Sequence, residues 1–199
     1  KGKAKIVKEL VQQAIDQGID PKVILNDGLL AGMSIIGEKF KKDEVFVPEV
    51  LVAARAMNAG IAILEPKLIE VGNKAVGKVV IGTVKGDLHD IGKNLVIMML
   101  KGAGFEIIDL GIDVEAEEFV NKAEEVGADF ICMSALLTTT MNNMKEIIDI
   151  LNERGLRDKY IVMVGGAPLS ETFAKQIGAD YYAEDATTAA EIAKKAISA

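Results

Sequence analysis

The sequence predicts an N-terminal helical bundle followed by a flavodoxin/Rossmann-like α/β domain, whose five-stranded parallel sheet carries helices on both faces. Two observations predict this division. Residues 1–72 repeat apolar residues at helical spacing, whereas residues 78–199 alternate short apolar runs with amphipathic segments. Five strand–helix units in succession are typical of a parallel sheet. The segment between the two regions, NKAVG at 73–77, has the composition of a linker.

Three helices are expected in the N-terminal domain. The first ends at Gly18. Its expected apolar face consists of Ile6, Leu10 and Ala14. The second starts at Asp20 and Pro21, a capping residue followed by proline in the first turn, and extends to about residue 40. The third starts near Pro48, and Pro66 is expected to kink its end.

The second domain is expected to place its unusual residues at one edge of the sheet. The expected strands are 78–84, 105–110, 129–134, 160–164 and 180–183. The expected helices lie near 92–103, 115–126, 141–154, 170–177 and 186–198. The commonest order of such a sheet is 2-1-3-4-5, and ligands bind at the carboxyl ends of its first and third strands. The loops KGDLHDIGKN, SALLTTTMN and GGAP follow the first, third and fourth strands.

The overall composition argues against several classes of protein. A net charge of −7 is unfavourable for binding to nucleic acid or to an anionic membrane surface. The single cysteine, Cys132, permits no internal disulfide and indicates a reducing, cytoplasmic setting. It lies in an apolar run, so we expect a small buried side chain. Neither a secretory leader nor an apolar run of membrane-spanning length is recognised, and no membrane association is expected.

The single histidine, His89, lies in the glycine-containing loop after the first expected strand. Asp87 is close enough in sequence to accept a hydrogen bond from the ring and fix its tautomer. A zinc or dinuclear site made by the protein alone needs more histidine or cysteine ligands than this chain contains. The motifs G-x-S-x-G, G-x-x-x-x-G-K-[ST] and G-x-G-x-x-G are not found in the sequence. One imidazole backed by a carboxylate is still sufficient as an axial ligand to a metal whose other ligands come from a macrocycle.

The pattern Asp87-x-His89-x-x-Gly92 resembles the D-x-H-x-x-G signature of cobalamin-binding proteins. Two further motifs of that family, S-x-L and G-G, follow at comparable spacing. They fall here at Ser134, Leu136, Gly165 and Gly166. The segment EKFKKDEVFVPEVLVAARAM at 38–57 resembles the helical cap of methionine synthase and of stand-alone corrinoid proteins. The resemblance therefore covers nearly the whole chain.

The resemblance implies a role for each motif. The corrinoid binds with its lower base displaced, His89 becomes the lower axial ligand of cobalt, and Asp87 holds the other ring nitrogen. Thr140 continues this relay at a position where methionine synthase has a serine. The expected cofactor-binding residues are Asp87, His89, Asp90, Ile91, Gly92, Ser134, Leu136, Thr138, Gly165, Gly166, Phe40 and Val47. The last two belong to the cap, and the two adjacent glycines leave room for the displaced nucleotide tail.

The resemblance also implies what such a chain does. With cobalamin or a related cobamide as cofactor, it carries a methyl group on cobalt between a substrate-specific methyltransferase and an acceptor methyltransferase. A reductive activase acts on it in trans. The chain is not expected to catalyse a reaction alone, and its implied setting is anaerobic one-carbon metabolism. The donor can be methanol, a methylamine, a methoxylated aromatic or methyl-tetrahydrofolate.

Three alternatives stay open. A cobalamin-dependent sensor or regulator shares the cap, although the chain shows no basic recognition helix. The cobalamin subunit of a mutase shares the three motifs but is not expected to have the cap. Without the resemblance, the remaining interpretation is a flavodoxin-like module that binds a divalent cation through Asp87 and Asp90.

Overall fold

The structure, a computed structural model, describes residues 2–71 and 75–198. The chain divides into two compact units. The helical unit is formed mainly by residues up to Ala75, and the sheet unit is formed mainly by residues from Val76 onward. Residues 73 and 74 of the expected linker lie outside the described residues.

The elements of the helical unit follow the expected order, with one difference in the middle. They are α1 (Ala4–Asp16), α2 (Pro21–Val23), the π-helix η1 (Ile24–Leu30), α3 (Ala31–Lys41) and α4 (Val47–Glu70). The expected second helix therefore contains a π-helical segment between two α-helical ones. Asp20 caps its start, because its carboxylate accepts a hydrogen bond from the N–H of Lys22 at 2.8 Å. α4 continues through Pro66 to Glu70.

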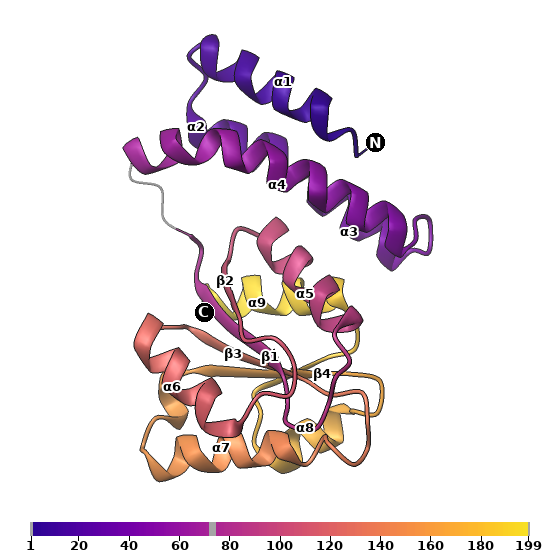
Figure 1. The fold of residues 1–199 in the computed structure, drawn as a ribbon, viewed down its shortest axis with the longest axis vertical. Coiled ribbons are helices and arrows are strands. Elements are labelled where there is room, and N and C mark those ends of the chain that lie inside the picture. The colour runs from indigo at the N-terminus through magenta and orange to yellow at the C-terminus, as the bar shows by residue number, and fades with distance from the viewer. Residues whose placement is uncertain (1, 72–74, 199) are drawn as a thin grey trace. The chain divides into compact units, whose positions relative to one another are not determined.

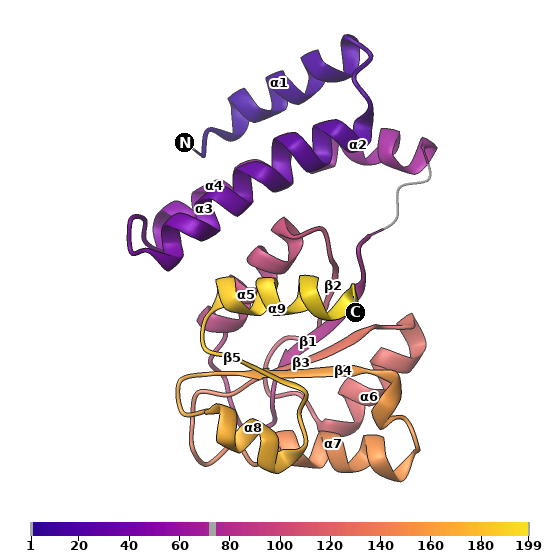
Figure 2. The ribbon, with the colours of Figure 1, turned by 180° about the vertical axis from the view of Figure 1, so that it is seen from behind.

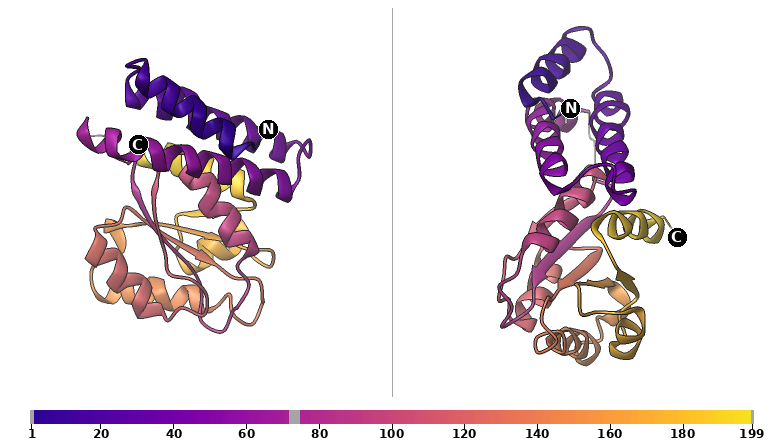
Figure 3. Two further views of the ribbon diagram at one scale, coloured as in Figure 1. Left: turned by 45° about the horizontal axis from the view of Figure 1, so that its top comes forward. Right: turned by 90° about the vertical axis from the view of Figure 1, so that its right-hand side faces the viewer.

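The apolar face expected for α1 is wrong at two of its three residues, since of these only Ala14 packs against the core of the unit. Ile6 and Leu10 are exposed, whereas Val11 is buried in a core that also contains Ile24 and Leu64. Figure 3 shows α1 and α3 alongside α4, and the same pairs are in contact. Spacings of three and four residues fit two overlapping stripes of α1, and packing selects the stripe that contains Val11.

Helix α4 is long and apolar enough between Val47 and Leu68 to cross a membrane, by length and composition alone. The sequence-based expectation was that no apolar run reaches membrane-spanning length, and this finding differs from it. In the structure, Leu64 of this helix is fully buried against other helices of the unit. Gly60 allows close packing, because a Cβ there would lie 2.8 Å from Leu29 and 3.0 Å from Val7. The core helix of a helical bundle is as apolar as a membrane span, so composition does not distinguish the two.

The sheet unit confirms the predicted fold class, with five parallel strands in the order β2-β1-β3-β4-β5. The strands are β1 (Lys78–Thr83), β2 (Glu106–Asp109), β3 (Phe130–Ser134), β4 (Ile161–Gly165) and β5 (Tyr181–Ala183). Each bound is within one residue of the prediction. β1 and β3 are buried along nearly their whole length, which explains their unbroken apolar sequences.

Helices cover both faces of this sheet. They are α5 (Ile91–Gly102), α6 (Ala116–Val126), α7 (Asn143–Glu153), α8 (Glu171–Ile177) and α9 (Ala186–Ile197), and a short 3-10 helix, η2 (Arg157–Lys159), precedes β4. α5 and α9 lie on one face, and α6, α7 and α8 lie on the other (Figure 1, Figure 2). Gly82 of β1 makes room for Phe119 of α6, because a Cβ at Gly82 would lie 2.8 Å from the phenyl ring.

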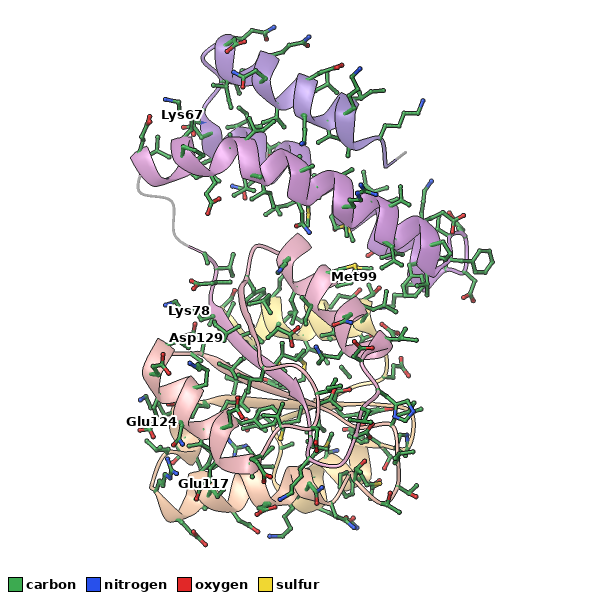
Figure 4. The ribbon with its side chains drawn as sticks, viewed as in Figure 1. Lys67, Lys78, Met99, Glu117, Glu124 and Asp129 are labelled. Carbon is green, nitrogen blue, oxygen red and sulfur yellow. The ribbon has the colours of Figure 1, made fainter. Side chains whose placement is uncertain are left out.

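The register of the sheet aligns the carboxyl ends of its strands. Thr83 of β1 pairs with Ser134 of β3, which in turn pairs with Gly165 of β4. At the opposite end of the sheet, the N–H of Lys78 donates a 2.7 Å hydrogen bond to the carboxylate of Asp129, and Figure 4 shows these two residues together. The three loops with unusual sequences therefore leave the sheet at one edge.

Candidate functional site

Asp87, in the loop after β1, is a fully buried carboxylate. Its Oδ1 accepts a hydrogen bond from the backbone N–H of His89 at 3.1 Å and lies 2.7 Å from Nδ1 of the same residue. Its Oδ2 accepts hydrogen bonds from the N–H groups of Leu136 at 2.8 Å and Leu137 at 3.2 Å, and from the Thr140 hydroxyl at 2.7 Å. One carboxylate thus joins the loops after β1 and β3, where the strand order reverses.

The charge of Asp87 depends on these contacts. Burial alone would raise the pKa of the Asp87 carboxyl, because desolvation disfavours the ionised form. Hydrogen bonds from the Leu136 N–H, the His89 ring and the Thr140 hydroxyl outweigh burial and hold that pKa well below its usual range. Asp87 is therefore an ionised acceptor at neutral pH.

The tautomer of His89 follows from the charge of its partner. An ionised carboxylate only accepts hydrogen bonds, so Nδ1 carries the proton in the 2.7 Å contact with Asp87. In the neutral ring, the lone pair is then on Nε2. The side chain of His89 is 51% exposed, and no hydrogen bond to Nε2 is found within the described part of the chain. One carboxylate therefore holds the ring while the second nitrogen stays available, as in a metal-ligating histidine.

Three residues that were not identified from the sequence hold the same loop. The Thr83 hydroxyl donates a hydrogen bond to the His89 carbonyl at 3.0 Å, and the Asn143 amide donates one to the Lys85 carbonyl at 2.7 Å. The carboxylate of Asp113 accepts a backbone N–H of the loop at 2.7 Å. These residues come from β1, α7 and the loop after β2, and no sequence spacing relates them to His89. The sequence offered one indication for Asp113: the loop after β2 leaves the sheet at the same carboxyl edge as the loop of His89.

Three of the expected cofactor-binding residues lie at the start of α5, Asp90 directly before the helix and Ile91 and Gly92 in its first turn. Asp90 accepts a hydrogen bond from the side chain of Asn94 at 3.0 Å and so stabilises its own helix. Ile91 is 74% exposed. A Cβ at Gly92 would meet nothing within 4 Å, so the packing of this chain does not require glycine there. Ile91 and Gly92 are thus free to meet a ligand.

Exposed apolar side chains gather in the loops at this edge of the sheet. Leu88, next to His89, is 65% exposed. The other members of this apolar rim are Ile91, Ile112, Leu136 and Leu137. Single exposed apolar residues are ordinary, whereas several from adjoining loops indicate a binding surface. The available nitrogen of His89 therefore belongs to an edge of the sheet that carries several exposed apolar side chains.

The remaining expected residues of the sheet unit also lie at this edge. Ser134 and Gly165 pair side by side where β3 and β4 end, and Thr138 is exposed in the loop after β3. Gly166 has a φ of +138°, and a Cβ there would overlap the carbonyl oxygen of Ala135. Glycine at 166 is therefore required by the backbone of this chain itself, independently of any ligand that the position contacts.

The two expected cap residues belong to the helical unit. Phe40 lies in the last turn of α3 and Val47 is the first residue of α4, and both are partly buried. Phe46, beside Val47, is 64% exposed and was not selected from the sequence. The structure thus brings Asp87, His89 and Thr140 into direct contact.

The described residues do not support a metal site made by the protein alone. No group of three or more His, Cys, Asp or Glu side chains that could hold a metal ion occurs in residues 2–71 and 75–198. Both oxygens of Asp87 already accept N–H or O–H donors, which leaves them unsuited to a divalent cation shared with Asp90. Cys132 is buried, and burial raises the pKa of its thiol to about 12.

Comparisons with known proteins cover both units. A family model described as a B12 binding domain matches residues 77–193, and a second model with the same description matches residues 1–65. The chain is 49% identical to a corrinoid protein of Desulfitobacterium hafniense, over 98% of this chain and 91% of the relative. It is also 49% identical to a dimethylamine corrinoid protein of Methanosarcina barkeri, over 89% of this chain and 84% of the relative. A crystal structure of the methanol:cobalamin methyltransferase complex MtaBC from Methanosarcina barkeri matches with a TM-score of 0.89 and 35% identity, covering 99% of this chain and 75% of that chain.

Proposed function

The chain belongs to the family of B12-binding corrinoid proteins of methyltransferase systems, and from this premise we propose that it binds its corrinoid base-off with His89 as the lower axial ligand. Its cofactor is cobalamin or a related cobamide. In this proposal the chain carries a methyl group between two methyltransferases and is not a catalyst by itself.

The observation that carries the proposal is the chain of contacts from Thr140 through Asp87 to His89. It leaves Nε2 available on a single half-exposed imidazole. A corrin ring brings its own equatorial nitrogen ligands, so one nitrogen from the protein is enough to complete the lower side. Leu88 and Ile91 suit the apolar face of such a ring, and the open space beside Gly92 allows it to approach α5.

The residues of the site tune a cofactor that supplies the chemistry. When bound, the corrinoid cobalt provides the nucleophile and the leaving group for methyl transfer. Asp87 holds the proton of the neutral ring on Nδ1, which leaves the lone pair of Nε2 for ligation. Thr140 donates to the far oxygen of Asp87 and keeps the carboxylate ionised.

The other motif residues have proposed places around the cofactor. Ser134 and Leu136 hydrogen-bond and line the displaced nucleotide tail, and Thr138 contacts the corrin edge. Gly165 and Gly166 leave space for that tail. Support comes from their common position at the carboxyl edge of β3 and β4. Asp90 contributes by starting α5, since it bonds to Asn94 in the first turn of the helix.

The helical unit acts in this proposal as a cap for the upper, methyl-bearing side of the cofactor, with Phe40 and Val47 as its contacts. Segment 73–77 is the hinge that lets the cap move when a partner docks. The proposed partners are a substrate-specific methyltransferase, an acceptor methyltransferase and a reductive activase. A methylamine methyltransferase is the first candidate, because a relative at 49% identity is named for dimethylamine and the methanol complex matches at 35%. The proposed setting is anaerobic one-carbon metabolism in the cytoplasm.

The test is an absorbance spectrum of the protein after reconstitution with hydroxocobalamin and removal of free corrinoid. We expect the wild type to retain colour with a histidine-ligated, base-off spectrum. His89→Gly should lose that signature, and added imidazole should restore it. Lys85→Ala is the matched control, because its side chain lies in the same loop but pairs with Glu115 at 2.8 Å. A colourless wild type, or a His89→Gly spectrum identical to that of the wild type, would contradict the proposal.

A further inference from the structure

Asp113, in the loop after β2, has a backbone conformation that side chains disfavour. Its φ is +54°, and within the described residues only Asp43 among the other non-glycine residues also has a positive φ. The left-handed region is unfavourable for a residue with a Cβ, and glycine adopts it without that strain. An aspartate kept in this conformation therefore suggests that its carboxylate is needed there.

The contacts of Asp113 all lie on the loop that carries the histidine. Its Oδ1 accepts a hydrogen bond from the N–H of Gly86 at 2.7 Å. Its own N–H donates to the carbonyl of Asp87 at 3.0 Å. The short segment from Gly86 to Asp87 is thus held from both ends by one residue of a neighbouring loop. Gly86 itself has a φ of +77°, which glycine adopts without the strain of a Cβ.

The position of this segment decides the geometry of the site. The Asp87 carboxylate is 2.7 Å from the His89 ring and 2.7 Å from the Thr140 hydroxyl, and both contacts require its backbone to stay in place. Bonds to its carboxylate come from the loops after β1 and β3, whereas Asp113 holds the backbone from the loop after β2. Asp113 adds to the other backbone contact of Asp87, whose N–H donates to the Val84 carbonyl at 3.1 Å, and it is the residue that anchors this turn to the loop after β2.

We propose that Asp113 is a positioning residue of the corrinoid site, whose carboxylate holds the Gly86–Asp87 turn so that Asp87 keeps the His89 ring in its ligating tautomer and orientation. Asp113 contacts neither the ring nor the proposed ligand position. It acts through Asp87. The inference on ring geometry applies to the protein without cofactor, and only its consequence for ligation rests on the proposed function.

The test compares Asp113→Gly with Asp113→Asn in the full chain. Glycine relieves the backbone strain and removes the carboxylate, so a residue with a merely conformational role would be improved or unchanged by it. Asparagine tolerates a positive φ and keeps an oxygen acceptor for the Gly86 N–H. Asp43→Gly is the matched control, since Asp43 has a φ of +56° and belongs to the helical unit rather than to the sheet unit.

The first measurement uses the protein without corrinoid. Because the chain has one histidine, selective nitrogen-15 labelling gives the signals of one imidazole. We expect a protected Nδ1–H resonance in the wild type, Asp113→Asn and Asp43→Gly proteins, and its loss through faster exchange in Asp113→Gly. An unchanged Nδ1–H resonance in Asp113→Gly, together with unchanged thermal unfolding, would overturn the proposal.

The second measurement uses protein reconstituted with hydroxocobalamin at one fixed pH. The ratio of histidine-ligated to unligated bound corrinoid should fall about tenfold in Asp113→Gly, which is the scale of losing one charge-assisted hydrogen bond. It should stay near the wild-type value in Asp113→Asn. Equal losses in both variants would also overturn the proposal, because the oxygen acceptor would then be irrelevant. A wild type that binds no corrinoid would instead refute the proposed function, while the imidazole measurement would still decide the role of Asp113.

Discussion

The Asp87 carboxylate accepts hydrogen bonds from five donors although solvent does not reach it. A buried carboxylate with fewer donors would tend to take up a proton, and a protonated Asp87 would no longer require the proton on Nδ1 of His89. The backbone N–H groups of Leu136 and Leu137 therefore have a chemical effect as well as a structural one. They help to keep the acid ionised and, through it, keep the proton of the neutral imidazole on Nδ1.

The pH dependence of stability tests the charge of Asp87. Its pKa is lower in the folded protein than the value of about 3.9 in an unfolded chain, so ionised Asp87 stabilises the fold. That contribution is complete well above pH 4 and is lost as the pH falls below about 4 toward the folded pKa. We expect Asp87→Asn to lower the free energy of unfolding at pH 7 by about 2–3 kcal/mol, and the difference from the wild type to narrow below pH 4. Urea denaturation across this range measures both, and parallel curves for the two proteins would contradict the prediction.

Gly92 allows stability and binding to be separated. It lies in the first turn of α5, where a Cβ would meet nothing within 4 Å. Gly92→Ala should therefore raise the free energy of unfolding without cofactor by a few tenths to about 1 kcal/mol. If the corrin ring approaches this helix, the same methyl group should weaken corrinoid binding on the order of tenfold. Thermal unfolding and equilibrium binding of hydroxocobalamin measure the two effects, and unchanged affinity would place the ring elsewhere.

The sequence was sufficient to predict that Asp87, His89 and Thr140 act together, but it did not predict the residues that hold their loop in place. His89, Asp87 and Thr140 were predicted through a family resemblance, and the structure brings them within hydrogen-bond distance. Asp113 and Asn143 were missed because each reaches the histidine loop across the fold, from positions more than twenty residues away in the chain. Such contacts depend on how loops approach one another, and a single sequence carries no periodic signal for that.

At the scale of elements, strands were easier to predict than helix faces. β1 and β3 are buried on both sides, so each appears in the sequence as an unbroken apolar run with clear ends. A helix face is read from spacings of three and four residues, and in α1 two overlapping stripes satisfied that rule. The π-helix Ile24–Leu30 was missed for a related reason, because its altered spacing arises from packing and has no sequence signature of its own.

The packing of α6 on β1 depends on the small size of Gly82. A Cβ there would lie 2.8 Å from the ring of Phe119, so Gly82→Ala should overpack the core and lower the free energy of unfolding by about 1–3 kcal/mol. Shortening the opposing side chain should relieve the overlap. In Phe119→Leu protein, the additional effect of Gly82→Ala should therefore be smaller. A double-mutant cycle measured by urea denaturation tests this, and additive effects would show that the two residues do not compete for space.

At the scale of the whole molecule, the chain contains a separate core in each unit. One core is built from Val11, Ile24, Leu64 and their neighbours, and another from residues of the sheet and of α6, α7 and α8. The contacts among Asp87, His89 and Thr140 are made by loops of the sheet unit. In the proposed carrier, this division lets the cap move during partner exchange without disturbing the contacts of Asp87.

Because each unit has its own core, a packing defect in one unit should destabilise that unit and leave the other unchanged. Gly60 lies where Leu29 and Val7 both approach α4, so Gly60→Val should overpack the helical core by about 1–3 kcal/mol. We expect faster amide hydrogen exchange in α1 and α4, which share that core, and unchanged exchange in β1 and β3. Hydrogen-exchange mass spectrometry of the protein without cofactor measures both regions in one experiment, with Gly28→Ala as the control because a Cβ there meets nothing within 4 Å. Equal acceleration in the helical unit and the sheet would mean that the chain unfolds as one cooperative body, and a cap that moves independently of the histidine site would then be untenable.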